Sequence, residues 1–100
     1  NTINLLNFLA AKAVELKNIL FDIIIDDGLH SVSANINFLK YSLHKLNKNG
    51  FYIIEDILNE ETDRFRTELN KVKNITYNIL EFPHEKNIYD NRICIIQHGW

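Results

Sequence analysis

The chain has 100 residues, 46% of them hydrophobic and 24% charged, which is typical of one small globular domain rather than a disordered segment. A net charge of −2 gives no general electrostatic reason to bind nucleic acid or an anionic membrane, and no apolar run approaches the ~18 residues of a membrane span. The single cysteine, Cys94, excludes an internal disulfide and fits a reducing compartment, so we expect a cytoplasmic protein.

The first predicted element is an amphipathic helix from about Ile3 to Leu16, with Asn18 as its stop, because apolar residues recur on one helical face. The next is a strand from Phe21 to Ile25, a short apolar run rich in β-branched residues, as in buried parallel strands. The change from helical to strand patterning predicts the start of an α/β arrangement.

A second helix is predicted after this strand, with Ser31 or Ser33 as its N-cap. The polar cluster Asn47–Gly50 would end this helix, and Phe51 to Ile54 would form the second buried strand. Apolar residues at steps of four and three would face the sheet: Val32, Ile36, Leu39, Leu43 and Leu46.

The remaining predicted elements are a third helix and two strands. Asn59 precedes several acids, which suits an N-cap followed by a first turn where the helix dipole favours negative charge. We expect strands from Ile75 to Phe82 and from Ile93 to Ile96, joined by a polar connection over His84–Asp90, with Cys94 a buried small hydrophobe. The third helix would pack through Phe65, Leu69 and Val72.

The order of these elements predicts the fold class. Strands that alternate with helices indicate an α/β sheet with parallel strands and crossover helices. Two closing strands without a helix between them indicate that the last strand is antiparallel.

Two pairs of acids follow the two parallel strands: Asp26 with Asp27, and Glu55 with Asp56. Adjacent strands lie ~4.8 Å apart, so these carboxylates would gather at one sheet edge, where open α/β sheets bind ligands. Like charges so close raise one another's pKa unless a cation compensates them, and a hard divalent ion such as Mg²⁺ prefers oxygen ligands. His30, in the loop after Asp27, would then accept the proton of a hydroxyl activated by the metal.

Two strings of residues resemble those of a known family: F-D-I-I-I-D-D-G-L-H at 21–30 and L-N-K-N-G-F-Y-I-I-E-D at 46–56. They are similar to the C-terminal half of class I S-adenosylmethionine-dependent methyltransferases. Within that class they most resemble the metal-dependent sugar O-methyltransferases of macrolide biosynthesis and the related cephalosporin hydroxylase-like group. The resemblance implies half of a Rossmann-like sheet with an antiparallel last strand.

Carried over to this sequence, the resemblance implies that Asp27, Glu55 and Asp56 bind Mg²⁺ or Mn²⁺ and that His30 is the catalytic base. Asp26 is assigned to the S-adenosylmethionine site. The implied activity is O-methyl transfer to a sugar or another small hydroxylated molecule, without a nucleic-acid or membrane partner. A homo-oligomer stays open.

The first half of the family pattern has no counterpart in this sequence. The family's glycine-rich loop and the acid that holds the cofactor ribose are missing, and the glycines present are Gly28, Gly50 and Gly99. The chain also contains no methionine. We therefore expect residues 1–100 to be a single partial domain of a longer protein, without the N-terminal cofactor-binding half.

Two other functions stay open. One is a non-catalytic α/β interaction module derived from the same fold, in which substitutions Asp27→Asn and Glu55→Gln change nothing and Mg²⁺ does not alter thermal stability. The other is a phosphoacceptor, receiver-like domain. That class requires a lysine near the acids at the end of a later strand, whereas the last predicted strand runs into Gln97 and His98.

Overall fold

The computed structural model of the chain describes residues 2–4, 19–27, 31–82 and 91–99. The strands in these ranges are β1 (Thr2–Asn4), β2 (Phe21–Asp26), β3 (Leu46–Ile57), β4 (Ile75–Glu81) and β5 (Arg92–His98). The α-helices are α2 (Val32–Ser42) and α3 (Thr62–Leu69), and two short 3₁₀ helices are η1 (Leu43–Lys45) and η2 (Asn59–Glu61).

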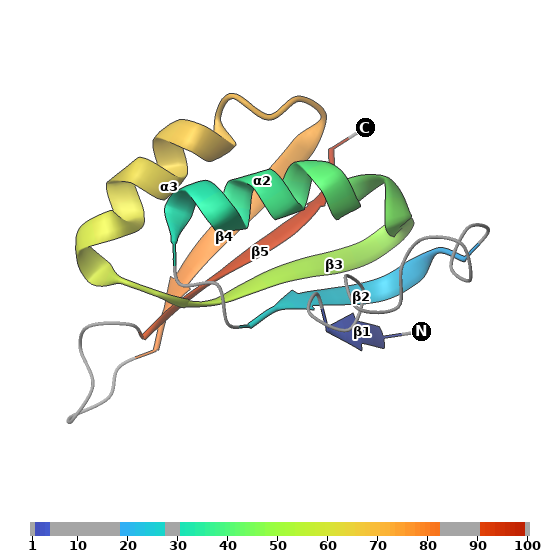
Figure 1. The fold of residues 1–100 in the computed structure, drawn as a ribbon, viewed down its shortest axis with the longest axis horizontal. Coiled ribbons are helices and arrows are strands. Elements are labelled where there is room, and N and C mark those ends of the chain that lie inside the picture. The colour runs from blue at the N-terminus through green and yellow to red at the C-terminus, as the bar shows by residue number, and fades with distance from the viewer. Residues whose placement is uncertain (1, 5–18, 28–30, 83–90, 100) are drawn as a thin grey trace.

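The strands form a single sheet with the order β1-β2-β3-β5-β4 (Figure 1). Strands β1, β2 and β3 are parallel, and β5 runs antiparallel to both of its neighbours, β3 and β4. The predicted fold class is therefore confirmed: an α/β sheet with parallel strands, crossover helices and an antiparallel last strand.

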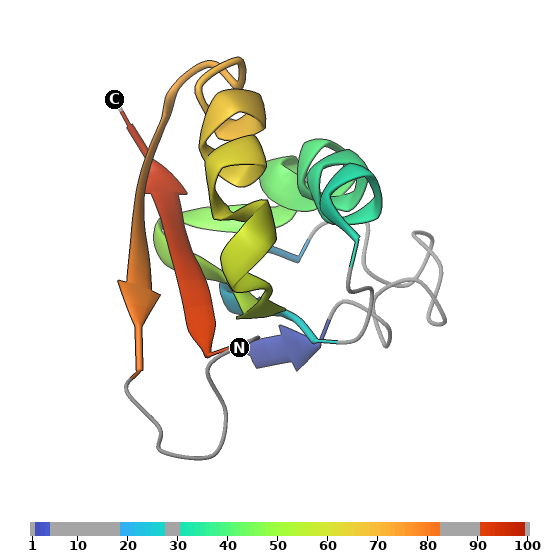
Figure 2. The same cartoon turned by 90° about the vertical axis from the view of Figure 1, so that its left-hand side faces the viewer.

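Both α-helices cover the same face of the sheet (Figures 1 and 2). The reason is topological. The connections β2-α2-β3 and β3-α3-β4 join parallel strands and move in the same direction across the sheet, so right-handed crossovers place both helices on one side. Neither helix in the described ranges is long and apolar enough to cross a membrane.

The core lies between this sheet face and the two helices. Residues paired across the sheet share a face, so Ile24, Tyr52 and Ile96 line up in register and are all fully buried. Cys94 is buried beside them as predicted, and burial raises the pKa of its thiol to about 12. The helices contribute apolar side chains that the sequence predicted for this role: Val32, Ile36, Leu39, Phe65 and Leu69.

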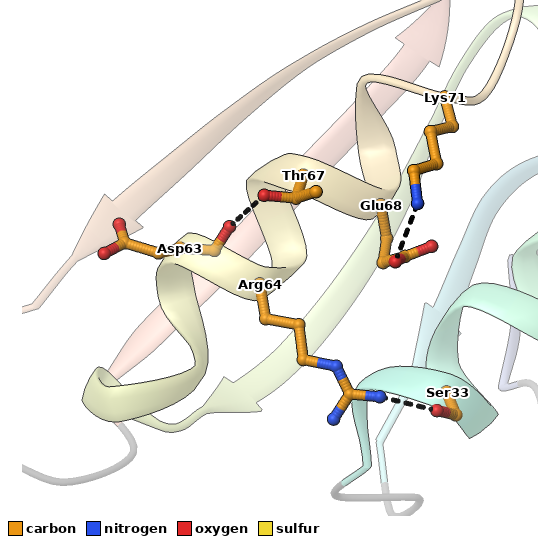
Figure 3. A network of polar contacts seen from close by, with 6 residues as sticks. All are labelled: Ser33, Asp63, Arg64, Thr67, Glu68 and Lys71. Atoms are coloured by element: carbon orange, nitrogen blue, oxygen red, sulfur yellow. Dashed lines mark hydrogen bonds and ion pairs between the residues drawn. The ribbon is translucent and has the colours of Figure 1, made fainter.

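Polar contacts fix the two helices to each other and to the loops before them. Of the two predicted caps, Ser31 is the N-cap of α2, and its Oγ accepts a hydrogen bond from the backbone N–H of Ala34 at 3.4 Å. Ser33 has a different role: its Oγ accepts a hydrogen bond at 3.0 Å from the guanidinium of Arg64 on α3 (Figure 3). The start of α2 is thus linked to α3.

The prediction of a helix from Ile3 is wrong at its start, because Thr2–Asn4 form strand β1. These residues pair in parallel with Ile23, Ile24 and Ile25, so pairing along the edge of β2 overrides the helical pattern. The rest of the predicted helix and its stop at Asn18 lie outside the described residues.

The turn predicted at Asn47–Gly50 is instead part of β3, which begins at Leu46. Phe21 pairs with Leu46 and Ile23 with Phe51, so the polar cluster bulges out opposite a single residue of β2, Asp22. Asn47 Nδ2 donates a hydrogen bond to the Asp22 carboxylate at 3.0 Å. A Cβ at Gly50 would lie 2.6 Å from the Asp22 carbonyl oxygen, so glycine is required for this close approach.

The other strand predictions are confirmed, whereas the predicted N-cap Asn59 is wrong. Asn59 lies in η2, and Glu61 precedes α3 without a side-chain cap. Of the acids that suggested a helical first turn, Glu60 and Glu61 lie in the 3₁₀ helix, whereas Asp63 lies in the first turn of α3. The predicted connection His84–Asp90 lies outside the described residues.

Candidate active site

The two pairs of acids meet at the edge where parallel strands β2 and β3 end. Asp26 pairs with Ile54 in the sheet register, so the next residues along the two strands, Asp27 and Glu55, come side by side. This is the edge at which open α/β sheets bind ligands. The structure thus brings together acids that lie far apart in the sequence, as predicted.

The two acids that end β2 have different surroundings. The Asp26 side chain is on the helix-covered face with an exposed fraction of 1%, and its Oδ2 accepts a hydrogen bond from Asn35 Nδ2 at 2.6 Å. Asp27 is exposed. Asp26 is therefore held by the protein interior in this structure, while Asp27 is open to solvent and ligands.

A β-bulge positions the second pair of acids. Ile54 pairs with Cys94 and Ile57 with Arg92, so two residues of β3, Glu55 and Asp56, oppose a single residue of β5. Asp56 has a φ of 58°, the left-handed conformation that few residues other than glycine adopt. Both acids are half-buried. The bulge lets Ile54 and Ile57 both be buried, and it turns the strand end where the acids lie.

The acids at this edge interact electrostatically. Partial burial raises the pKa of Glu55, and the negative charges of Asp27 and Asp56 raise it further. Within the described ranges, no three His, Cys, Asp or Glu side chains are close enough together, as placed, to hold a metal ion. His30, the predicted base, lies outside the described residues.

A small pocket adjoins the acids on the helix side. Its volume is about 10 Å³, room for roughly one water. Asp56 lines this pocket together with Asn35, Ser31 and Glu61. The pocket therefore lies between the end of β3 and the first turn of α2.

Asn35 is a site residue that the sequence reasoning missed. It lies on the apolar face of α2 between Val32 and Ile36, with an exposed fraction of 4%. The signal was present, because a lone polar residue at a helix position that faces the core needs a polar partner there. Its partner proves to be the acid that ends β2.

Comparison with known protein families and with curated proteins finds no match to this chain. Solved structures do match. An O-methyltransferase from Bacillus cereus, solved in complex with SAH, gives a TM-score of 0.66 at 13% identity over 91% of this chain and 47% of its own. A Klebsiella pneumoniae protein described as a candidate O-methyltransferase gives 0.63 at 14% identity over 86% of this chain and 46% of its own.

These similarities establish the fold. The chain has the class I S-adenosylmethionine-dependent methyltransferase fold that the sequence resemblance predicted, and it spans less than half the length of the two solved proteins. The acids Asp27, Glu55 and Asp56 lie where strands β2 and β3 end, the edge at which open α/β sheets generally bind ligands.

Proposed function

We propose that this chain is the C-terminal half of an S-adenosylmethionine-dependent O-methyltransferase that uses Mg²⁺ and acts on a sugar or another small hydroxylated molecule. The observation that carries the proposal is the acidic edge, formed by Asp27, Glu55 and Asp56 at the ends of β2 and β3, where partial burial and then the charges of Asp27 and Asp56 raise the pKa of Glu55. The fold shared with two O-methyltransferases supports methyl transfer as the chemistry. The cofactor-binding half belongs to the rest of the longer protein.

The side chains at this edge have the chemical type of ligand atom that a hard divalent cation prefers. Asp27, Glu55 and Asp56 supply oxygen ligands, which Mg²⁺ and Mn²⁺ prefer, and a cation would relieve the repulsion that raises the pKa of Glu55. In this structure these three carboxylates are not close enough together to hold a metal ion, so metal binding requires that their side chains rotate toward a common point. Asp27 is exposed and thus free to rotate.

In the proposed reaction, residues of this chain bind the metal and move one proton. A bound Mg²⁺ supplies Lewis acidity, which lowers the pKa of a substrate hydroxyl. His30 accepts the hydroxyl proton as general base. S-adenosylmethionine, held by the cofactor-binding half, would supply the methyl group for the substrate oxygen and would leave as S-adenosylhomocysteine.

The test of this proposal is turnover by the full-length protein, followed as S-adenosylhomocysteine formation with a panel of sugars and other small hydroxylated substrates. We expect Mg²⁺-dependent turnover that His30→Ala abolishes while cofactor binding stays intact. His44→Ala is the matched control, because His44 is exposed in η1. Turnover by His30→Ala at the parent rate would contradict the role of His30, and turnover unaffected by chelation would contradict the metal.

Other parts of the sequence prediction remain proposals. We place the protein in the cytoplasm, without nucleic-acid or membrane partners, and leave a homo-oligomer open. The assignment of Asp26 to the cofactor site also remains a prediction, and the buried hydrogen bond to Asn35 gives this carboxylate a second, internal role.

A further inference from the structure

The hydrogen bond between Asp26 and Asn35 is a buried polar contact that joins the end of β2 to α2. The exposed fractions of the two residues are 1% and 4%, and 2.6 Å separates Asn35 Nδ2 from Asp26 Oδ2. Burial of polar groups is costly unless they are paired, so this short contact holds both side chains in one arrangement. It fixes the position of the residue directly before Asp27.

The start of α2 is fixed at the same place by its own backbone. The Asn35 backbone N–H donates a hydrogen bond to the Ser31 carbonyl at 2.8 Å, and the Ser31 side chain caps the helix. Asn35 therefore belongs to the first turn of α2 through its backbone and to the end of β2 through its side chain. Asn35 thus joins the end of β2 to the first turn of α2.

Asn35 also lies beside a pocket that the other strand of the acidic edge borders. It lines the small pocket of about 10 Å³ that Asp56 lines from β3. One side chain on α2 thus contacts the acid that ends β2 and shares a pocket with the acid at the bulge of β3.

We propose that Asn35 is a positioning residue for the metal-binding acids: through Asp26 it sets the place of Asp27 relative to Glu55 and Asp56. This inference rests on the proposed function, because it concerns the same metal site. Asn35 touches no reacting atom in this role. It acts as metal-site residues outside the ligand set do, by orienting the ligands.

The test is the dissociation constant of Mn²⁺, measured by electron paramagnetic resonance in the full-length protein without substrate. We expect Asn35→Ala to weaken Mn²⁺ binding by about 10- to 100-fold, the range found for residues that orient metal ligands. Asn37→Ala is the matched control, since Asn37 is exposed on the same helix, and we expect its Mn²⁺ affinity to equal that of the parent.

A second control separates positioning from stability. Leu69→Ala removes a side chain buried at the far end of α3 and lowers stability without touching the acidic edge. We expect this variant to keep the parent Mn²⁺ affinity. If Asn35→Ala does not fold, Asn35→Ser, which replaces the amide N–H donor by a hydroxyl donor, is measured instead, with an expected loss of affinity smaller than that of alanine.

The outcomes distinguish this inference from the proposed function. If the parent binds Mn²⁺, Asp27→Asn weakens binding and the Asn35 variant binds as the parent does, the positioning role is wrong and the metal site stands. If Asp27→Asn binds Mn²⁺ as well as the parent, or the parent does not bind it, the metal site is wrong and the positioning role with it. Equal losses in Asn35→Ala and Leu69→Ala would also overturn the role, because the effect would then follow stability.

Discussion

The acids in the parallel half of the sheet differ from those in the antiparallel half in what neutralises them. In the antiparallel half, the Glu81 carboxylate lies 3.3 Å from the guanidinium of Arg92. In the parallel half, partial burial and then the charges of Asp27 and Asp56 raise the pKa of Glu55, and within the described ranges no cation pairs with Glu55. The pair between β4 and β5 is complete within the protein, whereas the proposed function assigns Asp27, Glu55 and Asp56 to a cation from outside.

The largest expected effect tests this comparison directly. We expect Glu55→Gln to weaken Mn²⁺ binding to the full-length protein by about 100-fold or more, roughly 3 kcal/mol, because it removes the charge of a ligand. Glu81→Gln makes the same chemical change in the antiparallel half and should leave the Mn²⁺ affinity unchanged. Titration calorimetry measures the Mn²⁺ affinity of both variants. Equal affinities would show that the acids of the two halves do not differ in Mn²⁺ binding.

A second effect concerns the buried hydrogen bond next to the acidic edge. Asn35→Ala removes the hydrogen bond that the Asn35 side chain donates to the buried Asp26 carboxylate. We expect this substitution to lower the free energy of unfolding by about 1–3 kcal/mol. Asn37→Ala, on the exposed face of the same helix, should change it by less than about 0.5 kcal/mol. Urea unfolding measures both. Equal stabilities would show that the short contact adds nothing to the fold.

A smaller effect follows from the raised pKa of Glu55. In the folded state this carboxyl holds its proton more tightly than in the unfolded chain, so its contribution to stability is greatest at low pH and declines as the pH rises through the folded pKa. Without divalent ions, we expect Glu55→Gln to be more stable than the parent at pH 7, by less than about 1 kcal/mol. Urea unfolding in a chelator should show this difference vanish below about pH 4, where Glu is protonated in both states.

The smallest effect is expected for the exposed ion pair. The Glu81 side chain is 57% exposed, so its pairing with Arg92 should contribute about 0.2–1 kcal/mol to stability. A double-mutant cycle with Glu81→Gln and Arg92→Gln measures this coupling. We expect Glu81→Gln to lower stability at pH 7, opposite in sign to Glu55→Gln, and the same sign for both would contradict the electrostatic contrast between the two halves.

Much of the fold follows from local patterns in the sequence. The apolar runs at Phe21–Ile25 and Phe51–Ile54 gave strands because buried parallel strands are continuously apolar. The meeting of Asp27 with Glu55 followed from topology alone, since carboxyl ends of parallel strands share an edge. Those features depend on hydrophobic periodicity and chain direction, which a single sequence carries.

Other features depend on pairing between distant segments, which no local pattern encodes. Thr2–Asn4 form a strand because β2 offers an edge, not because of their own pattern. The polar cluster Asn47–Gly50 looks like a turn but bulges opposite Asp22. The bulge at Glu55 and Asp56 likewise exists only in relation to β5. The partner of Asn35 could be expected to exist, but its identity required the structure.

The strand order has a consequence for the protein during its synthesis. Strand β5 lies between β3 and β4, although it follows both in the chain. When β4 leaves the ribosome, the position beside β3 is still empty, and β4 has no strand with which to pair. The sheet closes only once residues 92–98 insert between two segments that are already present. Nascent chains arrested before this point should therefore expose one edge of β3 and both edges of β4, and these are the species that chaperones would need to protect.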